Sequence, residues 1–178
     1  MQINKSILQI KPYKGGESKI SGVEKIIKLS SNENALGASP QAIAAYQQSA
    51  TDLHRYPDGS CQQLRDKIAQ IYNLSAENIV CGAGSDEIIN LLINGFTEPG
   101  DEIIYSEHGF LMYKIYALAA AVQPIAAPET NLKADPQALL SKISPKTRII
   151  FLANPNNPTG SYLDRDELEG FIKQVPQN

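Results

Sequence analysis

From Pro40 onward the chain alternates helical and extended segments, and this order constrains its fold more than any other feature. Apolar residues that recur every three or four positions indicate helices, and short apolar runs between turn residues indicate strands. The predicted helices are 40–49, 60–73, 85–96, 110–121, a short one after Asp135 and one opening near Asp164, and the predicted strands are 78–81, 102–106, 122–126 and 148–153. Strands separated by helices of this length form a mostly parallel sheet that is covered on both faces. We therefore predict an α/β fold.

The two ends of the chain differ from this regular middle. Residues 1–27 are polar, rich in Gly and Lys and only weakly periodic, so we predict an N-terminal arm there and a domain over 28–178. After the last predicted helix the chain reads V-P-Q-N, where the alternation requires another central strand. A parallel sheet that lacks a strand exposes unpaired backbone groups and apolar surface. We therefore expect an incomplete domain, and hence a fragment.

Composition excludes several classes of partner. The net charge of −3 and the pI near 5.4 give no broad attraction to nucleic acid or to an anionic membrane surface. Cys61 and Cys81 are too few for a disulfide framework or a zinc site. No stretch reaches the roughly 18 to 20 apolar residues that a membrane span requires, and the N-terminus has no signal-peptide pattern. We expect a cytoplasmic protein that binds no nucleic acid, membrane or metal.

The segment from Val80 to Glu87 reads as a strand, a glycine-rich turn and the start of a helix. Glycines let the backbone approach a ligand closely, and the free N–H groups of a first helical turn attract anions. This pattern predicts a phosphate site at Gly84, Ser85 and Asp86. A dinucleotide fingerprint is the weaker alternative, because Glu87 stands where its third glycine belongs. A helix merely capped by Ser85 or Asp86, without a ligand, is another.

A second motif, N-P-N-N-P-T-G from Asn154 to Gly160, follows the apolar run at 148–153. Open α/β sheets bind ligands at the carboxyl ends of their strands, so a ligand site is expected here. The prolines fix the chain, and the asparagine side chains offer hydrogen-bond donors. The alternative is a tight turn held by hydrogen bonds from asparagine side chains.

Five motifs, taken in order, resemble those of the fold-type-I aminotransferases, and among them the histidinol-phosphate aminotransferase family. They are S-S-N-E-N-A-L-G at 30–37, R-Y-P-D-G at 55–59, G-A-G-S-D-E at 82–87, G-F-L-M-Y at 109–113 and N-P-N-N-P-T-G at 154–160. The resemblance implies the three-layer α/β/α large domain of a transferase that depends on pyridoxal 5'-phosphate, with a mostly parallel sheet, incomplete here.

The resemblance also implies cofactor-binding residues. Asn157 matches the asparagine that hydrogen-bonds the phenolic oxygen of the pyridoxal ring. Ser85 and Asp86, which follow Gly84, match positions whose backbone N–H groups bind the cofactor phosphate. Phe110 stands where the family places an aromatic residue that stacks on the ring, although taken alone it would be interpreted as a core aromatic.

Other residues match the substrate side and the dimer interface of the family. Tyr56 matches a tyrosine that reaches the cofactor phosphate of a partner subunit, which implies a homodimer. Tyr13 and Asn32 lie in segments that contribute to the substrate site. The peptide bond before Pro158 is expected to be cis. His108 receives no role, because the family requires no histidine there and a lone histidine is more often structural.

The implied reaction is transamination between histidinol phosphate and 2-oxoglutarate in histidine biosynthesis, with imidazole-acetol phosphate and glutamate as the other pair. The lysine that holds the cofactor, the aspartate facing its ring nitrogen and the phosphate-binding arginines are expected beyond residue 178, so no catalytic residue is assigned within the chain. Two alternatives of the same fold type stay open, an aromatic aminotransferase and a threonine-phosphate decarboxylase. In another class, the chain is an inactive fragment that serves as a binding or dimerising piece.

Overall fold

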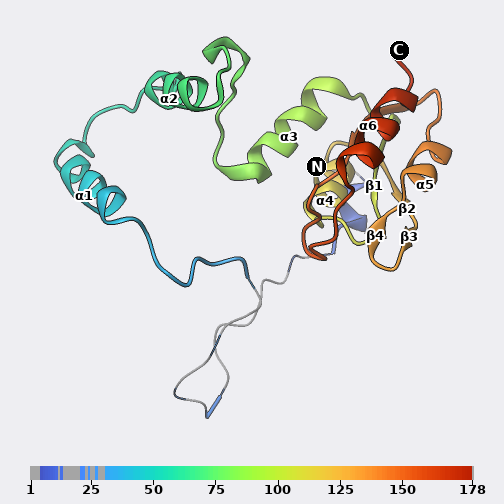
Figure 1. The fold of residues 1–178 in the computed structure, drawn as a ribbon, viewed down its shortest axis with the longest axis horizontal. Helices are drawn as coiled ribbons and strands as arrows, with labels where there is room; N and C mark the ends of the chain where they lie inside the picture. The colour runs from blue at the N-terminus through green and yellow to red at the C-terminus, as the bar shows by residue number, and fades with distance from the viewer. Residues whose placement is uncertain are drawn as a thin grey trace. The chain divides into compact units, whose positions relative to one another are not determined.

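The computed structural model describes residues 5–11, 13, 21–22, 24, 27 and 31–177 (Figure 1). These residues form two compact units, Pro12–Val80 and a second that combines Met1–Lys11 with Cys81–Asn178. Most of the predicted arm at 1–27 lies outside the described residues, so its character stays a prediction. None of the helices in the described part of the chain has the length and the apolar run needed to cross a bilayer.

The described residues of the unit Pro12–Val80 form two α-helices and two short 3-10 turns. They are α1 (Pro40–Ser49), η2 (Ala50–Asp52), α2 (Gln62–Tyr72) and η3 (Ala76–Asn78). Helix α1 has the predicted bounds, with proline at its first position, where a missing N–H costs nothing. Before α2, the carboxylate of Asp58 accepts hydrogen bonds from the hydroxyl and N–H of Ser60 and from the N–H of Gln62, which hold its pKa below the ordinary value.

The strand predicted at 78–81 is wrong. Ala76–Asn78 forms a 3-10 turn, in which Asn78 N–H donates to Ser75 O at 3.0 Å, and residues 79–81 follow without strand pairing in the described structure. Ile79 has the extended dihedral angles that its apolar neighbours suggest, with φ −115° and ψ 124°. A strand also requires a hydrogen-bonded neighbour. The described sheet offers none to this segment, because its three strands pair only with one another.

The second unit is built around a parallel sheet in the order β2-β1-β5. Its strands are β1 (Glu102–Ser106), β2 (Gln123–Ala127) and β5 (Thr147–Phe151), and its helices are η1 (Ile7–Gln9), α3 (Gly84–Phe96), α4 (Met112–Ala119), α5 (Pro136–Ser141) and α6 (Arg165–Gln174). All three predicted strands and the four predicted α-helices of this unit are present, with ends that differ by a few residues.

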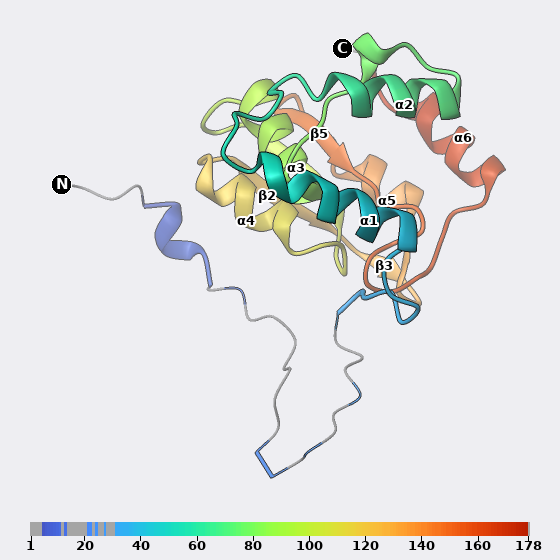
Figure 2. The same ribbon diagram turned by 90° about the vertical axis from the view of Figure 1, so that its left-hand side faces the viewer.

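Helices cover both faces of this sheet, as the sequence predicted. Ile103 and Tyr105 on β1 pack in one core cluster with Ile89 and Ile93 of α3 and with residues of α4. Ile104, between them, belongs to the opposite cluster, with residues of α5 and α6. Alternate side chains of a strand point to opposite faces, so β1 contributes to both cores. Figure 2 shows α3 and α4 on one side of the strands and α5 and α6 on the other. The three-layer α/β/α prediction is confirmed for this unit.

A small antiparallel hairpin, which the sequence did not predict, precedes α5. It pairs β3 (Glu129–Thr130) with β4 (Lys133–Ala134). Lys133 Nζ lies 2.7 Å from a carboxylate oxygen of Glu167 on α6. The same glutamate completes a capping box with Asp164, the N-cap of α6. The hairpin is therefore attached to the start of α6.

Candidate functional site

The carboxyl ends of β1 and β5 lie at one edge of the sheet, because the two strands are parallel. The loops that follow them are in contact, since Asn156 Nδ2 donates to His108 O at 3.4 Å. Phe110 belongs to the first of these loops and Asn157 to the second. Two of the predicted cofactor residues, 47 positions apart in the sequence, therefore lie in loops that touch.

Helix α3 comes directly before β1 in the chain. Its C-terminus leads through the short connection 97–101 into β1, and Ile89 and Ile93 belong to the same core cluster as Ile103 of that strand. The first residue of α3, Gly84, has φ +78°, a conformation that favours glycine. Gly84, Ser85 and Asp86 therefore lie at the end of α3 that is farther along the chain from β1, and their place beside the Asn157 loop stays a prediction.

The side chains at the start of α3 do not cap it as the ligand-free alternative required. In the described structure, neither Ser85 nor Asp86 hydrogen-bonds a free N–H group of the first turn through its side chain. The carboxylate of Glu87 instead accepts from the N–H of Ala83 at 2.6 Å. The N–H groups of the first turn therefore remain available to an anion, although Glu87 brings a negative charge close to them.

The three asparagines of the N-P-N-N-P-T-G loop have different surroundings. Asn154 exchanges two hydrogen bonds with the backbone of Leu163, at 3.0 and 2.8 Å. Asn156 is buried, and its amide also donates to Thr159 Oγ1 at 2.9 Å. Asn157 is exposed, and no hydrogen bond engages its side chain within the described residues. Two asparagines therefore hold the loop together, and Asn157 keeps a free amide. The bond before Pro158 is cis, as expected, and so is the bond between Asn154 and Pro155.

Aromatic rings connect the two loops to the core. The half-buried Phe110 meets Tyr113 edge to face, with ring centroids 6.0 Å apart. Tyr113 stacks on Phe151, the last residue of β5, at 4.6 Å. Burial raises the pKa of the Tyr113 hydroxyl, so this tyrosine stays neutral at physiological pH. Phe110 is therefore partly a core aromatic, but it lies at the margin of the cluster and not inside it.

A carboxylate that the sequence did not single out also reaches this edge. Glu129, on the unpredicted β3–β4 hairpin, contacts both Ser106, the last residue of β1, and His108 in the loop that follows. No local pattern in the sequence indicates this contact, because strands of two residues have no detectable periodicity, and Ser106 and His108 lie more than 20 positions before Glu129.

The remaining predicted site residues belong to the unit Pro12–Val80. Tyr56 is fully exposed and lines a cavity of about 840 Å³ together with Leu53 and Arg55. Tyr13 is 57% exposed, and Asn32 is exposed as well. Their roles in substrate binding and across a dimer stay predictions.

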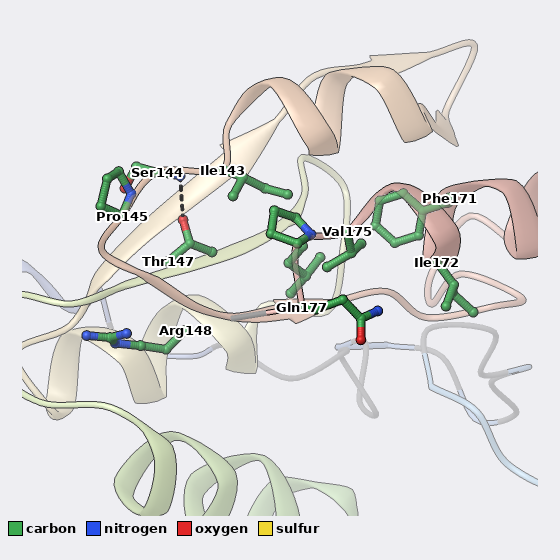
Figure 3. A pocket seen from close by; sticks show the side chains of 11 residues that line it. Ile143, Ser144, Pro145, Thr147, Arg148, Phe171, Ile172, Val175 and Gln177 are labelled. Carbon is green, nitrogen blue, oxygen red and sulfur yellow. Dashed lines mark hydrogen bonds between the residues drawn. The ribbon is translucent and has the colours of Figure 1, made fainter.

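A separate groove of about 740 Å³ lies beside β5, one of the two edge strands of the described sheet. Figure 3 shows three apolar side chains along it: Ile143 of the α5–β5 connection, Phe171 of α6 and Val175, which directly follows α6. The N–H of Ser144 donates to Thr147 Oγ1 at 3.0 Å at one end of the groove. None of the predicted cofactor residues lines this groove, so we assign the site to the loops at the carboxyl edge.

Comparisons with known proteins identify relatives of this chain. The profile of the family described as "Aminotransferase class I and II" matches residues 24–178. A histidinol-phosphate aminotransferase of Paramagnetospirillum magneticum is 53% identical over 162 residues, which cover 91% of this chain and 45% of that protein. A histidinol-phosphate aminotransferase of Rhodospirillum centenum is 49% identical over 173 residues, which cover 97% of this chain and 48% of that protein. The chain thus spans about half the length of the curated relatives that it matches.

Solved structures also resemble the chain. One is the crystal structure of histidinol-phosphate aminotransferase from Sinorhizobium meliloti in complex with pyridoxal-5'-phosphate. Its TM-score is 0.77 and its sequence identity 25%, and the match covers 82% of this chain and 40% of the chain in that crystal structure. The crystal structure of a putative histidinol-phosphate aminotransferase from Erwinia carotovora has a TM-score of 0.74 and 29% identity. The match covers 83% of this chain and 43% of the chain in that structure.

Proposed function

Because the chain belongs to the class I and II aminotransferases, we propose that it supplies the pyridoxal-phosphate-binding loops of an enzyme that transaminates histidinol phosphate with 2-oxoglutarate in histidine biosynthesis. The curated relatives named above support this choice of substrate. The proposed enzyme is a cytoplasmic homodimer.

The free amide of Asn157 is the observation that carries the proposal. Asn157 lies in a loop that touches the loop of Phe110. In the proposed site, the start of α3 lies at the same edge of the sheet. In the proposed site, Asn157 donates to the phenolic oxygen of the cofactor ring, and the face of Phe110 stacks on that ring. The backbone N–H groups of Ser85 and Asp86, which follow the turn at Gly84, bind the phosphate.

The described residues fit this cofactor, because the N–H groups, the aromatic ring and the free amide are of the kinds that bind a phosphate, a flat ring and a ring oxygen. When bound, pyridoxal phosphate supplies a ring that delocalises the negative charge left when a proton leaves the carbon bearing the amino group. The hydrogen bond from Asn157 favours the ionised phenolic oxygen and so tunes the ring. In the same proposal, Tyr13 and Asn32 contact the substrate, and Tyr56 reaches the phosphate of the cofactor in a partner subunit.

The test is a titration of the purified chain with pyridoxal phosphate, followed by equilibrium dialysis. A hydrogen bond to a charged group contributes about 1.5 kcal/mol or more, so Asn157→Ala should weaken binding roughly tenfold. Asn94→Ala is the matched control, because Asn94 lies exposed on α3 and bonds only to Asn90. A wild-type chain that binds no cofactor, or equal affinities of Asn157→Ala and wild type, would contradict the proposal.

Borohydride reduction adds a second measurement. Lys142 and Lys146 precede β5 and so lie at the amino edge of the sheet, opposite Asn157. We therefore expect the cofactor to dialyse away even after reduction, without becoming fixed to either lysine.

A further inference from the structure

A buried carboxylate holds the loop that leads from β1 to α4. The side chain of Glu129 is only 2% exposed, and donors from this loop surround it. Ser106 Oγ donates to Oε1 at 2.5 Å, His108 N–H donates to Oε1 at 3.0 Å, and His108 Nδ1 lies 3.0 Å from Oε2. Burial, the largest single influence, raises the pKa of Glu129, but the hydrogen bonds together hold it below its ordinary value. The group is therefore a carboxylate at neutral pH.

The same loop is bound on its other side. Asn156 Nδ2 donates to His108 O, which ties the loop to the segment that carries Asn157. Gly109 N–H closes a tight turn onto Ser106 O at 2.7 Å. Phe110 is the next residue, so the place of its ring depends on how firmly Ser106 and His108 are held.

We propose that Glu129 is a positioning residue of the cofactor site, which holds the loop from Ser106 to His108 so that Phe110 can stack on pyridoxal phosphate. This inference rests on the proposed function, because the role of Phe110 comes from there. Glu129 acts through the loop and not on the cofactor, since both of its oxygens already accept hydrogen bonds from protein groups. An outer group of this kind fixes the orientation of the residues that touch the ligand.

The geometry also fixes the tautomer of His108. An ionised carboxylate can only accept, so Nδ1 must carry the proton, and Nε2 carries none when the ring is neutral. The chain has two histidines, His54 and His108. In an NMR spectrum of the His54→Gln variant, the remaining imidazole nitrogen signals must therefore come from His108. Comparison with the wild type then assigns the signals of both histidines.

The decisive variant is Glu129→Gln, with Glu107→Gln as its matched control. Glutamine keeps the size of the side chain and one accepting oxygen, but it removes the charge and presents an amide to His108 Nδ1. Glu107 lies in the same loop, is exposed, and makes no side-chain hydrogen bond within the described residues. Glu129→Gln should shift His108 toward the tautomer protonated at Nε2 and weaken pyridoxal-phosphate binding roughly five- to tenfold, equivalent to about 1 to 1.4 kcal/mol. Glu107→Gln should change neither.

Cofactor binding and circular dichroism separate the possible failures. If the wild-type chain binds no pyridoxal phosphate, the proposed function fails and the inference fails with it. If the wild type binds and Glu129→Gln binds equally well, only the positioning role is overturned. If circular dichroism shows that Glu129→Gln is unfolded, Ser106→Ala replaces it, because that change removes one donor without removing the charge. A folded Ser106→Ala chain with weakened cofactor binding supports the inference, and unchanged binding contradicts it.

Discussion

Replacing Gly109 by alanine should destabilise the fold and disturb the loop that Glu129 holds. A Cβ atom at this position would lie 2.8 Å from Ser106 O, whereas ordinary contacts begin at 3.4 Å. The oxygen belongs to the backbone at the end of a strand paired on both sides, so it cannot swing away as a flexible side chain would. The loop must therefore move by about 0.6 Å, and such forced shifts in packed regions typically cost about 1 to 3 kcal/mol.

Urea unfolding followed by circular dichroism measures this effect. A loss of about 2 kcal/mol corresponds to a fall in Tm of roughly 4 to 8 °C for a chain of this size. The matched control is Gly95→Ala on α3, where an added Cβ meets nothing within 4 Å. That change should not destabilise the protein, because Gly95 lies in the last turn of α3 and alanine is a better helix former than glycine. If Gly109→Ala proved as stable as the wild type, within about 0.5 kcal/mol, the described loop geometry would be refuted.

Two further predictions concern pH and self-association. Acid should weaken the fold, because the pKa values of Glu167 and Glu129 are lower in the folded chain than in the unfolded one. A hydrogen bond from Lys133 lowers the pKa of Glu167, and the hydrogen bonds to Glu129 lower its pKa by more than burial raises it. As the pH falls, the unfolded chain therefore takes up protons before the folded chain does. Urea midpoints measured from about pH 7 down to pH 4 should fall, and a flat profile would contradict this. Ile172, 56% exposed in the groove beside β5, should promote association through apolar contact. Sedimentation should therefore detect less association in Ile172→Lys than in Gln174→Lys, which adds the same charge outside that groove, and equal behaviour would count against the idea.

Much of the fold could be predicted because local signals and tertiary packing agree. The run Ser39-Pro40 marks the start of α1, and Asp164 marks the start of α6 through a capping box. The strands β1 and β5 are short apolar runs because helices cover both of their faces. In each case the residues that indicate the element are the residues that stabilise it.

The failures concern features that no local pattern encodes. The segment 78–81 has apolar residues suited to a strand, but its residue types say nothing about whether a neighbour exists to pair with it. The β3–β4 hairpin turns through Asn131 and Leu132 at φ 53° and 61°, and leucine is not a residue that predicts a left-handed turn. Missing this hairpin also meant missing Glu129, and so the environment of His108.

The candidate site was partly predictable for the same reason. The motifs indicated which loops gather at the carboxyl edge, because parallel strands bring their ends together. They could not separate the asparagines that hold the loop from the one that is free, since that distinction depends on Leu163 and Thr159. The roles of Asn157 and Phe110 in cofactor binding stay predictions.

The central place of β1 in the sheet has a consequence for synthesis on the ribosome. Strand β1 leaves the ribosome before β2 and β5, and both of them pair with it. Each later strand therefore meets a partner that has already been made, and the sheet can grow outward from its middle as the chain lengthens. Helix α3, which packs on β1, emerges earlier still, so one face of that strand can be covered before its first neighbour arrives.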